Sequence, residues 1–274
     1  MIIDGKKLAT DVLARIREEV AELPRAPKLR VVMAGTHPAI ESFVRIKERR
    51  AQEAGIEFAV QHFPDDVSTD VLVAAVKEGD EDALIVQLPL PAHVDTDAVL
   101  AAIPLEKDAD VLSPEAYTRF EVNTPGALVP PVVFAVREVL ATHAVSLPGT
   151  RAVVVGRGRL VGKPVAEWLL HEGAQVEVVT RSSGNLTAAL RAADIIVSGA
   201  GVPKLITPEL IQSGVVLIDA GTSESSGVIV GDIDPACAEK AALLTPVPGG
   251  IGPLTVVGLL ANTLALAWRV QHHA

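Results

Sequence analysis

One segment near the carboxyl end combines residues that bring backbone close to a ligand. Thr245-Pro-Val-Pro-Gly-Gly-Ile-Gly-Pro-Leu-Thr255 holds three glycines and three prolines directly before a long apolar run. Glycine allows positive φ angles and carries no side chain to keep a ligand away, and Pro253 suits the first turn of a helix. The free N–H groups of that helix start could then face a ligand. The alternative is a rigid connector between two domains.

A second glycine cluster is typical of nucleotide binding. The run Arg151-Ala-Val-Val-Val-Gly156 is followed by Arg157-Gly158-Arg-Leu-Val-Gly162 and then by a helical pattern. Glycines permit a tight turn, and the N-terminus of the helix faces the pyrophosphate of a bound dinucleotide. The spacing is GxGxxxG and not the usual GxGxxG, so a plain connection between a strand and a helix is the alternative.

The residues after the next predicted strand indicate which nucleotide is bound. NAD-specific folds commonly place a carboxylate there for the ribose hydroxyls, whereas this chain reads Val178-Val-Thr-Arg-Ser182. Arg181, with Ser182 and Arg157, can hold a 2′-phosphate through charge-assisted hydrogen bonds. We therefore expect NADP as the cofactor. The alternative for Arg181 is a solvated loop arginine.

Helices and strands that alternate along the chain must position these segments. In the first half, the apolar periodicity predicts helices at residues 4–23, 37–54 and 69–77, and strands at 29–34, 56–63 and 83–87. In the second half, it predicts helices at 132–141, from Gly162 onward and at 254–271, and strands at 151–156, 176–179, 195–197 and 215–218. This alternation predicts an α/β protein with parallel sheets.

We expect two domains. Residues 1–123, completed by a carboxyl-terminal helix at 254–274, form a substrate domain, and residues 124–253 form a Rossmann-like nucleotide-binding domain.

Composition limits the classes of partner. The net charge of −10 removes the attraction for phosphate on which nucleic-acid binding depends. The amino terminus meets charge at Asp4, too early for a secretory signal, and the longest apolar run, Leu254 to Trp268, is interrupted by polar residues as in a buried helix. The seven histidines lack zinc-ligand spacing. We expect a soluble cytoplasmic protein without a nucleic-acid partner, a membrane span or a metal.

Five segments, taken together and in order, resemble the methylenetetrahydrofolate dehydrogenase/cyclohydrolase family. Any one of them is weak, but the set is highly specific and runs from about Asp4 to the final helix. The segments are Phe43-Val-Arg-Ile-Lys47, Val86-Gln-Leu-Pro-Leu-Pro91, Lys107-Asp-Ala-Asp110, the Gly156 turn and the segment 245–255.

The resemblance implies an amino-terminal folate-facing domain, a Rossmann-like NADP domain, a cleft between them and a homodimer. It also implies an enzyme of one-carbon metabolism with two activities. The first oxidises 5,10-methylenetetrahydrofolate to the methenyl cation, and the second hydrolyses that cation to 10-formyltetrahydrofolate.

The same resemblance implies residue roles. Lys47 matches the family's catalytic lysine, which can move protons when burial lowers its pKa. Gln87 matches the glutamine that orients this lysine, and Asp110 matches the aspartate that binds the pterin. Without the resemblance, all three have ordinary surface explanations. The implied substrate-binding residues are Phe43, Gln87, Leu88, Pro89, Asp110, Pro248, Gly249, Gly250 and Pro253. The implied cofactor-binding residues are Gly156, Arg157, Gly158, Gly162, Arg181, Ser182, Thr222 and Gly250.

The chain departs from the family pattern beside the lysine. Phe43 stands where the family usually has tyrosine, Ile40 where it usually has serine, and Val111 where it usually has glycine. The two lost hydroxyls lead us to expect that the dehydrogenase activity persists and that the cyclohydrolase activity is weakened. The alternatives are a dehydrogenase without hydrolase activity and a non-catalytic folate-binding protein.

Overall fold

The computed structural model describes residues 1–36, 38–225 and 228–273, and the chain divides into two compact units. One unit contains residues 1–9 and 132–255, and the other contains residues 10–131 and 256–274. The expected two-domain α/β organisation is confirmed. Along the chain, one division between the compact units falls between residues 131 and 132, whereas the sequence analysis starts the nucleotide domain at residue 124. The functional limits of each domain stay a prediction.

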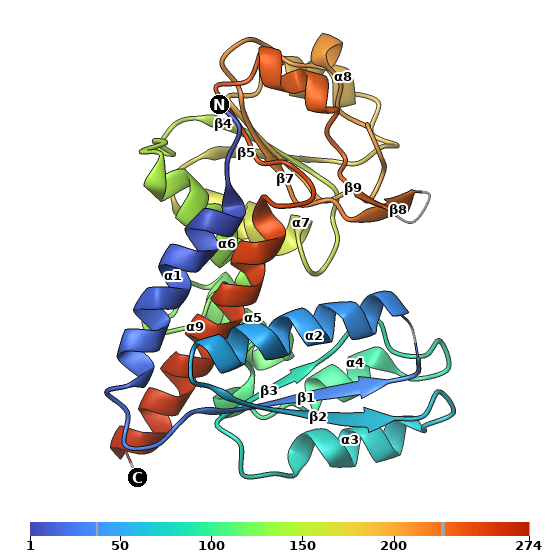
Figure 1. Cartoon of the computed structure of the whole chain (residues 1–274). Coiled ribbons are helices and arrows are strands. Elements are labelled where there is room, and N and C mark those ends of the chain that lie inside the picture. The colour runs from blue at the N-terminus through green and yellow to red at the C-terminus, as the bar shows by residue number, and fades with distance from the viewer. Residues whose placement is uncertain (37, 226–227, 274) are drawn as a thin grey trace. The chain divides into compact units, whose positions relative to one another are not determined.

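The unit with residues 10–131 contains a three-stranded parallel sheet. β1 (Lys28–Ala34) lies between β2 (Glu57–Phe63) and β3 (Ala83–Val86). Figure 1 shows α2 (Pro38–Glu53) over one face of this sheet and α3 (Thr69–Lys77) over the other. Alternate apolar residues of β1 and β3 pack against α3 and α4 (Thr96–Ala101). η1 (Leu105–Lys107) and α5 (Pro114–Glu121) complete the part of this unit that precedes residue 131.

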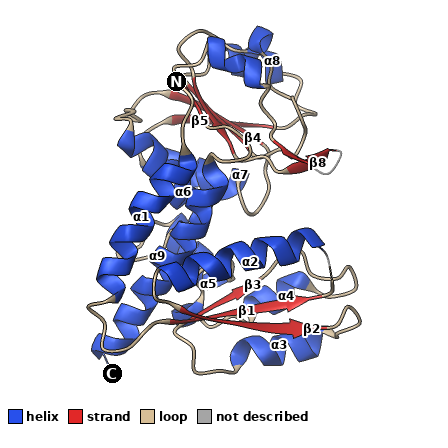
Figure 2. Ribbon diagram, in the orientation of Figure 1, coloured by secondary structure: helices blue, strands red, loops and turns tan. Residues whose placement is uncertain are grey.

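The unit with residues 132–255 contains a five-stranded sheet, in which all strand pairs are parallel. Its order is β10-β7-β6-β4-β5, formed by β4 (Arg151–Val155), β5 (Gln175–Val179), β6 (Ile195–Ser198), β7 (Val216–Asp219) and β10 (Leu243–Leu244). Its other elements are α6 (Pro131–Thr142), α7 (Gly162–His171), α8 (Leu186–Ala192), η2 (Pro208–Leu210), η3 (Pro235–Glu239) and the hairpin of β8 (Ser223–Ser225) with β9 (Val228–Val230). Figure 2 shows the helices of this unit outside its strands, as expected for a doubly wound sheet.

The predicted long helices and strands are present, with ends that differ by a few residues. The predicted start of the second helix, His37, lies outside the described residues. The sequence analysis did not predict the short elements α4, α5, α8, β8, β9 and β10. Such short segments show little apolar periodicity and depend on caps and tertiary packing, as with α5, which begins at the capping Ser113.

Two helices belong to both units, α1 (Gly5–Val20) and α9 (Ile251–His273). By length and composition α9 could cross a membrane, but 61% of its most apolar 18-residue window is buried, as expected for the buried helix predicted at Leu254 to Trp268. Within it, the buried Asn262 amide donates to the carbonyl oxygens of Ala109 and Val129, each over 2.8 Å. The helix is therefore packed as a core helix.

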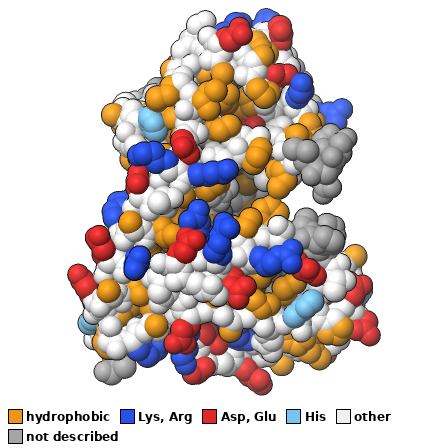
Figure 3. Space-filling model, in the orientation of Figure 1, with side chains coloured by type: hydrophobic (Ala, Val, Ile, Leu, Met, Phe, Trp, Pro, Cys, Tyr) orange, Lys and Arg blue, Asp and Glu red, His pale blue; other side chains and the backbone are white. Residues whose placement is uncertain are grey.

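Acidic and basic side chains are interspersed over the face drawn in Figure 3.

Candidate functional site

The first group of predicted site residues lies at the carboxyl edge of the three-stranded sheet. β1 and β3 are neighbours, but the chain leaves β1 through α2 toward β2 on the far side of the sheet. In open α/β sheets, ligands bind at such a point of reversal, outside the carboxyl ends of the strands. Gln87 directly follows β3, and its N–H donates to the carbonyl oxygen of Val32 in β1 over 2.8 Å.

The segment with Asp110 reaches this edge by pairing with β3. Asp108 forms a parallel bridge with Leu84, and the N–H of Ala109 donates to the carbonyl oxygen of Leu84 over 3.3 Å. The chain then runs beside β3 toward its carboxyl end, which carries Asp110 to the level of Val86, the residue before Gln87.

Lys47 and Gln87 are joined directly. The Nζ atom of Lys47 donates to Oε1 of Gln87 over 2.9 Å, and Nε2 of Gln87 donates to the carbonyl oxygen of Leu88 over 2.8 Å. The second bond fixes which side of the amide faces the lysine. The structure thus brings Lys47 of α2 to the end of β3.

Burial dominates the charge state of this group. Burial lowers the pKa of Lys47, and the attraction of Asp110 opposes that change in part. Burial likewise raises the pKa of Asp110, where Lys47 opposes the change and Asp108 adds to it. For Lys47 the loss of solvation outweighs the attraction of Asp110, so its pKa shifts toward values at which the neutral amine is accessible. A neutral amine is the form of lysine that can accept a proton.

The loop after Asp110 has an unusual backbone. Val111 is 1% exposed and has φ of 56°, in the left-handed region that β-branched residues rarely adopt. The carboxylate of Asp108 stabilises this conformation through two hydrogen bonds. Its Oδ1 accepts from the N–H of Leu112 over 3.2 Å, and its Oδ2 accepts from the N–H of Ser113 over 2.7 Å. This explains why a glycine would be well suited to position 111.

Other predicted substrate-binding residues are close in sequence to Lys47 and Gln87. Phe43 precedes Lys47 by one helical turn on α2 and is 41% exposed. Leu88 is half-buried, Pro89 is exposed, and the peptide bond between them is cis.

The glycine segment belongs to the other compact unit. Gly249 has φ of 103°, and a Cβ atom on Gly250 would lie 2.5 Å from the carbonyl oxygen of Pro246, so both positions require glycine. Pro248 is exposed and follows a cis peptide bond, and Pro253 lies in the first turn of α9, which begins at Ile251 and not at residue 254. The predicted substrate residues are thus divided between the two units, and the predicted cleft stays a prediction.

The predicted nucleotide turn follows β4 and enters α7. Gly156 is buried with φ of 108°, and a Cβ atom on Gly162 would lie 2.2 Å from the carbonyl oxygen of Gly156. Between them, Arg157 and Gly158 are exposed. The two outer glycines therefore allow the tight turn, while the residues between them are open to a ligand.

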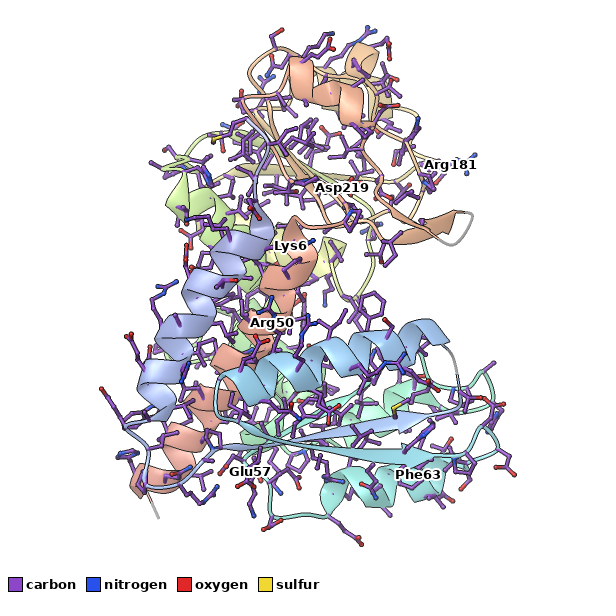
Figure 4. The ribbon with its side chains drawn as sticks, in the orientation of Figure 1. Lys6, Arg50, Glu57, Phe63, Arg181 and Asp219 are labelled. Carbon is purple, nitrogen blue, oxygen red and sulfur yellow. The ribbon has the colours of Figure 1, made fainter. Side chains whose placement is uncertain are left out.

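The predicted phosphate residues lie beside this turn. β5 pairs with β4, and the N–H of Gly156 donates to the carbonyl oxygen of Val179 over 2.8 Å. Arg181 and Ser182 follow two and three residues later, both exposed, and Figure 4 shows Arg181 at the outside of this unit. Thr222 is exposed and follows β7 at the same edge of the sheet.

Sequence reasoning missed two buried carboxylates at this edge. Asp219 ends β7, and Asp232 follows β9; they are 2% and 0% exposed. Figure 4 shows Asp219 within the interior of this unit. The only local signals were a carboxylate at the end of the apolar run Val215 to Ile218 and a Gly-Asp pair at 231–232. Within the described ranges, no group of three or more His, Cys, Asp or Glu side chains is placed to hold a metal ion.

Comparison with known proteins covers both halves of the chain. The family model for the catalytic domain of tetrahydrofolate dehydrogenase/cyclohydrolase matches residues 3–110, and the model for the NAD(P)-binding domain matches residues 130–271. The bifunctional protein FolD of Halothermothrix orenii is 40% identical over 280 residues, with 96% of each chain covered.

Solved structures of similar proteins have the same fold. The bifunctional FolD methylenetetrahydrofolate dehydrogenase/cyclohydrolase from Campylobacter jejuni has a TM-score of 0.95 at 31% identity, covering 98% of this chain and 99% of that one. The Trypanosoma brucei methylenetetrahydrofolate dehydrogenase-cyclohydrolase, complexed with NADP cofactor and inhibitor, has a TM-score of 0.93 at 36% identity, covering 98% of each chain.

Proposed function

Because the chain belongs to the tetrahydrofolate dehydrogenase/cyclohydrolase family, we propose that NADP is its cofactor and that Lys47 serves its hydrolytic reaction. The protein is a bifunctional enzyme: it oxidises 5,10-methylenetetrahydrofolate to the methenyl cation and hydrolyses that cation to 10-formyltetrahydrofolate. The observation that carries the residue assignment is the bond from Lys47 to Gln87 at the carboxyl edge of the sheet.

Hydrolysis requires proton transfers that one amine can perform. Water attacks the methenyl carbon, and neutral Lys47 accepts a proton from that water as the new C–O bond forms. The resulting ammonium donates this proton to N5 of the pterin as the bond between N5 and the one-carbon unit breaks. The hydroxyl proton of the intermediate passes to solvent, which leaves the formyl group on N10 and releases one proton overall.

Gln87 and Asp110 prepare this chemistry. Gln87 presents a neutral acceptor to Lys47, so it orients Nζ without adding a negative charge that would hold the lysine protonated. Asp110 is proposed to accept hydrogen bonds from the amino-pyrimidine edge of the pterin. Phe43, Leu88 and Pro89 offer apolar surface for the ring system. The substrate roles of Pro248, Gly249, Gly250 and Pro253 stay predictions.

The turn after β4 fits a dinucleotide. The space around position 158 is open, since no heavy atom lies within 4 Å of a Cβ atom built there, and α7 presents its N-terminus directly after the turn. We assign the pyrophosphate to the residues Gly156, Arg157, Gly158 and Gly162, the 2′-phosphate to Arg181 and Ser182, and the nicotinamide half to Thr222 and Gly250. When bound, NADP supplies the hydride acceptor for the methylene carbon.

The NADP assignment is supported by the exposed Arg181 at the end of β5, where no carboxylate follows the strand. It is also supported by the Trypanosoma brucei relative, whose structure is complexed with NADP. We further propose that the enzyme is a cytoplasmic homodimer, for which sedimentation should give twice the chain mass of 28.6 kDa.

Parallel assays of the two half-reactions test this assignment. Dehydrogenase activity is followed as NADPH or NADH formation at about 340 nm, and hydrolysis as loss of methenyltetrahydrofolate absorbance. Lys47→Met should abolish enzymatic hydrolysis and retain part of the hydride transfer. Lys77→Met, which changes an exposed lysine at the end of α3, is the matched control and should leave both rates unchanged. An equal collapse of both activities in Lys47→Met would instead assign Lys47 to substrate positioning or stability.

A further inference from the structure

One buried carboxylate accepts hydrogen bonds from the turn after β6 and fixes its conformation. We propose that Asp232 is a positioning residue for the cofactor, because it fixes this turn, at residues 199–202, against the nucleotide turn that starts at Gly156. The inference rests on the proposed binding of NADP at that turn. It concerns a residue that the sequence patterns did not indicate and that the folate reactions described above do not use.

Asp232 accepts hydrogen bonds from four groups at the end of β6. Its Oδ2 accepts from Oγ of Ser198 over 2.7 Å, from the N–H of Ala200 over 2.7 Å and from the N–H of Gly201 over 3.2 Å. Its Oδ1 accepts from the N–H of Val202 over 2.7 Å. All of these donors point inward at one carboxylate, so the conformation of the turn depends on it.

The turn held in this way packs directly on the nucleotide turn. A Cβ atom on Gly156 would lie 2.8 Å from the carbonyl oxygen of Gly199, and a Cβ atom on Gly199 would lie 2.4 Å from Cγ1 of Val161. Gly162 in turn packs on the carbonyl oxygen of Gly156. Because no free space separates these backbones, a shift of the turn after β6 must move the nucleotide turn or open a gap beside it.

The topology places both turns where a dinucleotide binds. In the order β5-β4-β6-β7, the chain leaves β4 toward β5 and then crosses to β6 on the other side. The point of reversal therefore lies between the carboxyl ends of β4 and β6. The glycine turn after β4 lies on one side of this point, and the turn that Asp232 holds lies on the other side.

A second buried carboxylate holds Asp232 in place. The Oδ1 atom of Asp219 accepts from the N–H of Asp232 over 3.1 Å and from the N–H of Gly221 over 3.0 Å, and its Oδ2 accepts from the N–H of Ile233 over 2.9 Å. A Cβ atom on Gly221 would lie 2.3 Å from Oδ1 of Asp232. The same carboxylate pair thus also fixes the residues that lead to Thr222, which we assign to the nicotinamide half.

An amide cannot replace the carboxylate at position 232. A carboxylate accepts through both oxygens, whereas asparagine keeps one acceptor and turns an NH2 group toward N–H donors. Asp232→Asn therefore keeps the volume of the side chain and removes acceptors from one side of the turn. The substitution should displace the turn without removing any proposed ligand of the folate substrate.

The test is a direct measurement of NADP affinity by calorimetry, together with both half-reactions. Asp232→Asn should weaken NADP binding about ten- to hundredfold and raise the KM for NADP by a similar factor, with the KM for methylenetetrahydrofolate little changed. Hydrolysis of methenyltetrahydrofolate, which uses no NADP, should stay within about twofold of wild type. Ser198→Ala removes one of the four donors and should weaken NADP binding in the same direction by a smaller factor. This second variant decides the matter if Asp232→Asn does not fold.

Asp234→Asn is the matched control, because Asp234 caps η3 through the N–H of Ala236 and pairs with Lys204 over 3.5 Å, which lies beyond the turn at residues 199–202. It should bind NADP as wild type does. The inference is overturned if Asp232→Asn and Ser198→Ala both bind NADP with wild-type affinity, or if hydrolysis falls by the same factor as NADP binding. If wild type itself fails to bind NADP, the proposed cofactor is wrong, and that result is distinct from the first two.

Discussion

Lys47 and Gln87 stand forty positions apart in the chain and share one hydrogen bond of 2.9 Å between Nζ and Oε1. The bond joins α2 to the first residue after β3. Because the acceptor is an amide, it directs the lysine without adding charge, and burial lowers the lysine pKa against the opposing attraction of Asp110. The pair is therefore arranged to keep a lysine both ordered and ready to lose its proton.

Gln87→Glu should move the pH dependence of hydrolysis upward. The added negative charge stabilises the ammonium form and raises the Lys47 pKa, so a higher pH is needed to produce the neutral amine. We expect the rising limb of the rate profile to shift by about one pH unit, which corresponds to about 1.4 kcal/mol. Gln61→Glu is the control, since Gln61 is bonded to Arg30 and not to Lys47. An unshifted profile in Gln87→Glu would show that neutral Lys47 does not limit the rate.

At position 111, the glycine variant should be more stable than the alanine variant, which is the reverse of the usual order of stability. Glycine commonly destabilises a regular element relative to alanine, but φ of 56° favours glycine. Val111→Gly should therefore unfold at a higher urea concentration than Val111→Ala, by about 1 kcal/mol in the free energy of unfolding. At the helical Val99 of α4, the same pair should show the ordinary order, with glycine less stable by about 1 kcal/mol. The same order at both positions would contradict the left-handed conformation at Val111.

Asp219 should make stability depend on pH between about 4 and 6. Burial raises the pKa of Asp219 from 3.8 to about 6, with backbone hydrogen bonds opposing the change and Asp232 adding to it. Its folded pKa thus exceeds its unfolded pKa, so this contribution to stability is full below about pH 4 and is lost as pH rises through about 6. The difference amounts to about 3 kcal/mol, at about 1.4 kcal/mol per pH unit.

Urea unfolding at several pH values checks this contribution. Asp219→Asn cannot titrate, so its free energy of unfolding should rise relative to wild type between pH 4 and 6 and run parallel to it above about pH 6. Asp234→Asn should show the opposite sign and only below about pH 4, since the Ala236 N–H lowers the pKa of Asp234 from 3.8 and its stabilisation is lost as the pH falls below that value. A pH-independent difference between wild type and Asp219→Asn would contradict the raised pKa.

Arg181→Ala should weaken NADP much more than NAD. If the guanidinium holds the 2′-phosphate, its removal costs charge-assisted hydrogen bonds that only NADP makes, about ten- to hundredfold in Kd. The comparison uses calorimetry with both nucleotides. Arg191→Ala, which removes another exposed arginine of the same unit on α8, should leave both affinities unchanged. Equal losses for NADP and NAD in Arg181→Ala would reject the proposed phosphate contact.

The sequence alone determined the alternation of strands and helices and the places where backbone must turn sharply. Apolar periodicity predicts the long elements, because side chains of a strand or helix repeat at a fixed spacing. Glycine requirements at Gly156 and Gly249 are similarly local, since each reflects the φ angle of one residue. The roles of Lys47 and Asp110 were not readable from spacing, and they came from the resemblance of several segments to one family.

Only the tertiary structure decided which distant side chains meet. The bridge between Asp108 and Leu84 brings Asp110 to the end of β3, and the packing of the loop forces Val111 into a left-handed conformation. No sequence pattern singled out Asp232, and only the fold brings its carboxylate within hydrogen-bond distance of four donors at the end of β6. Such contacts depend on strand order and register, which bring together residues that no local pattern connects.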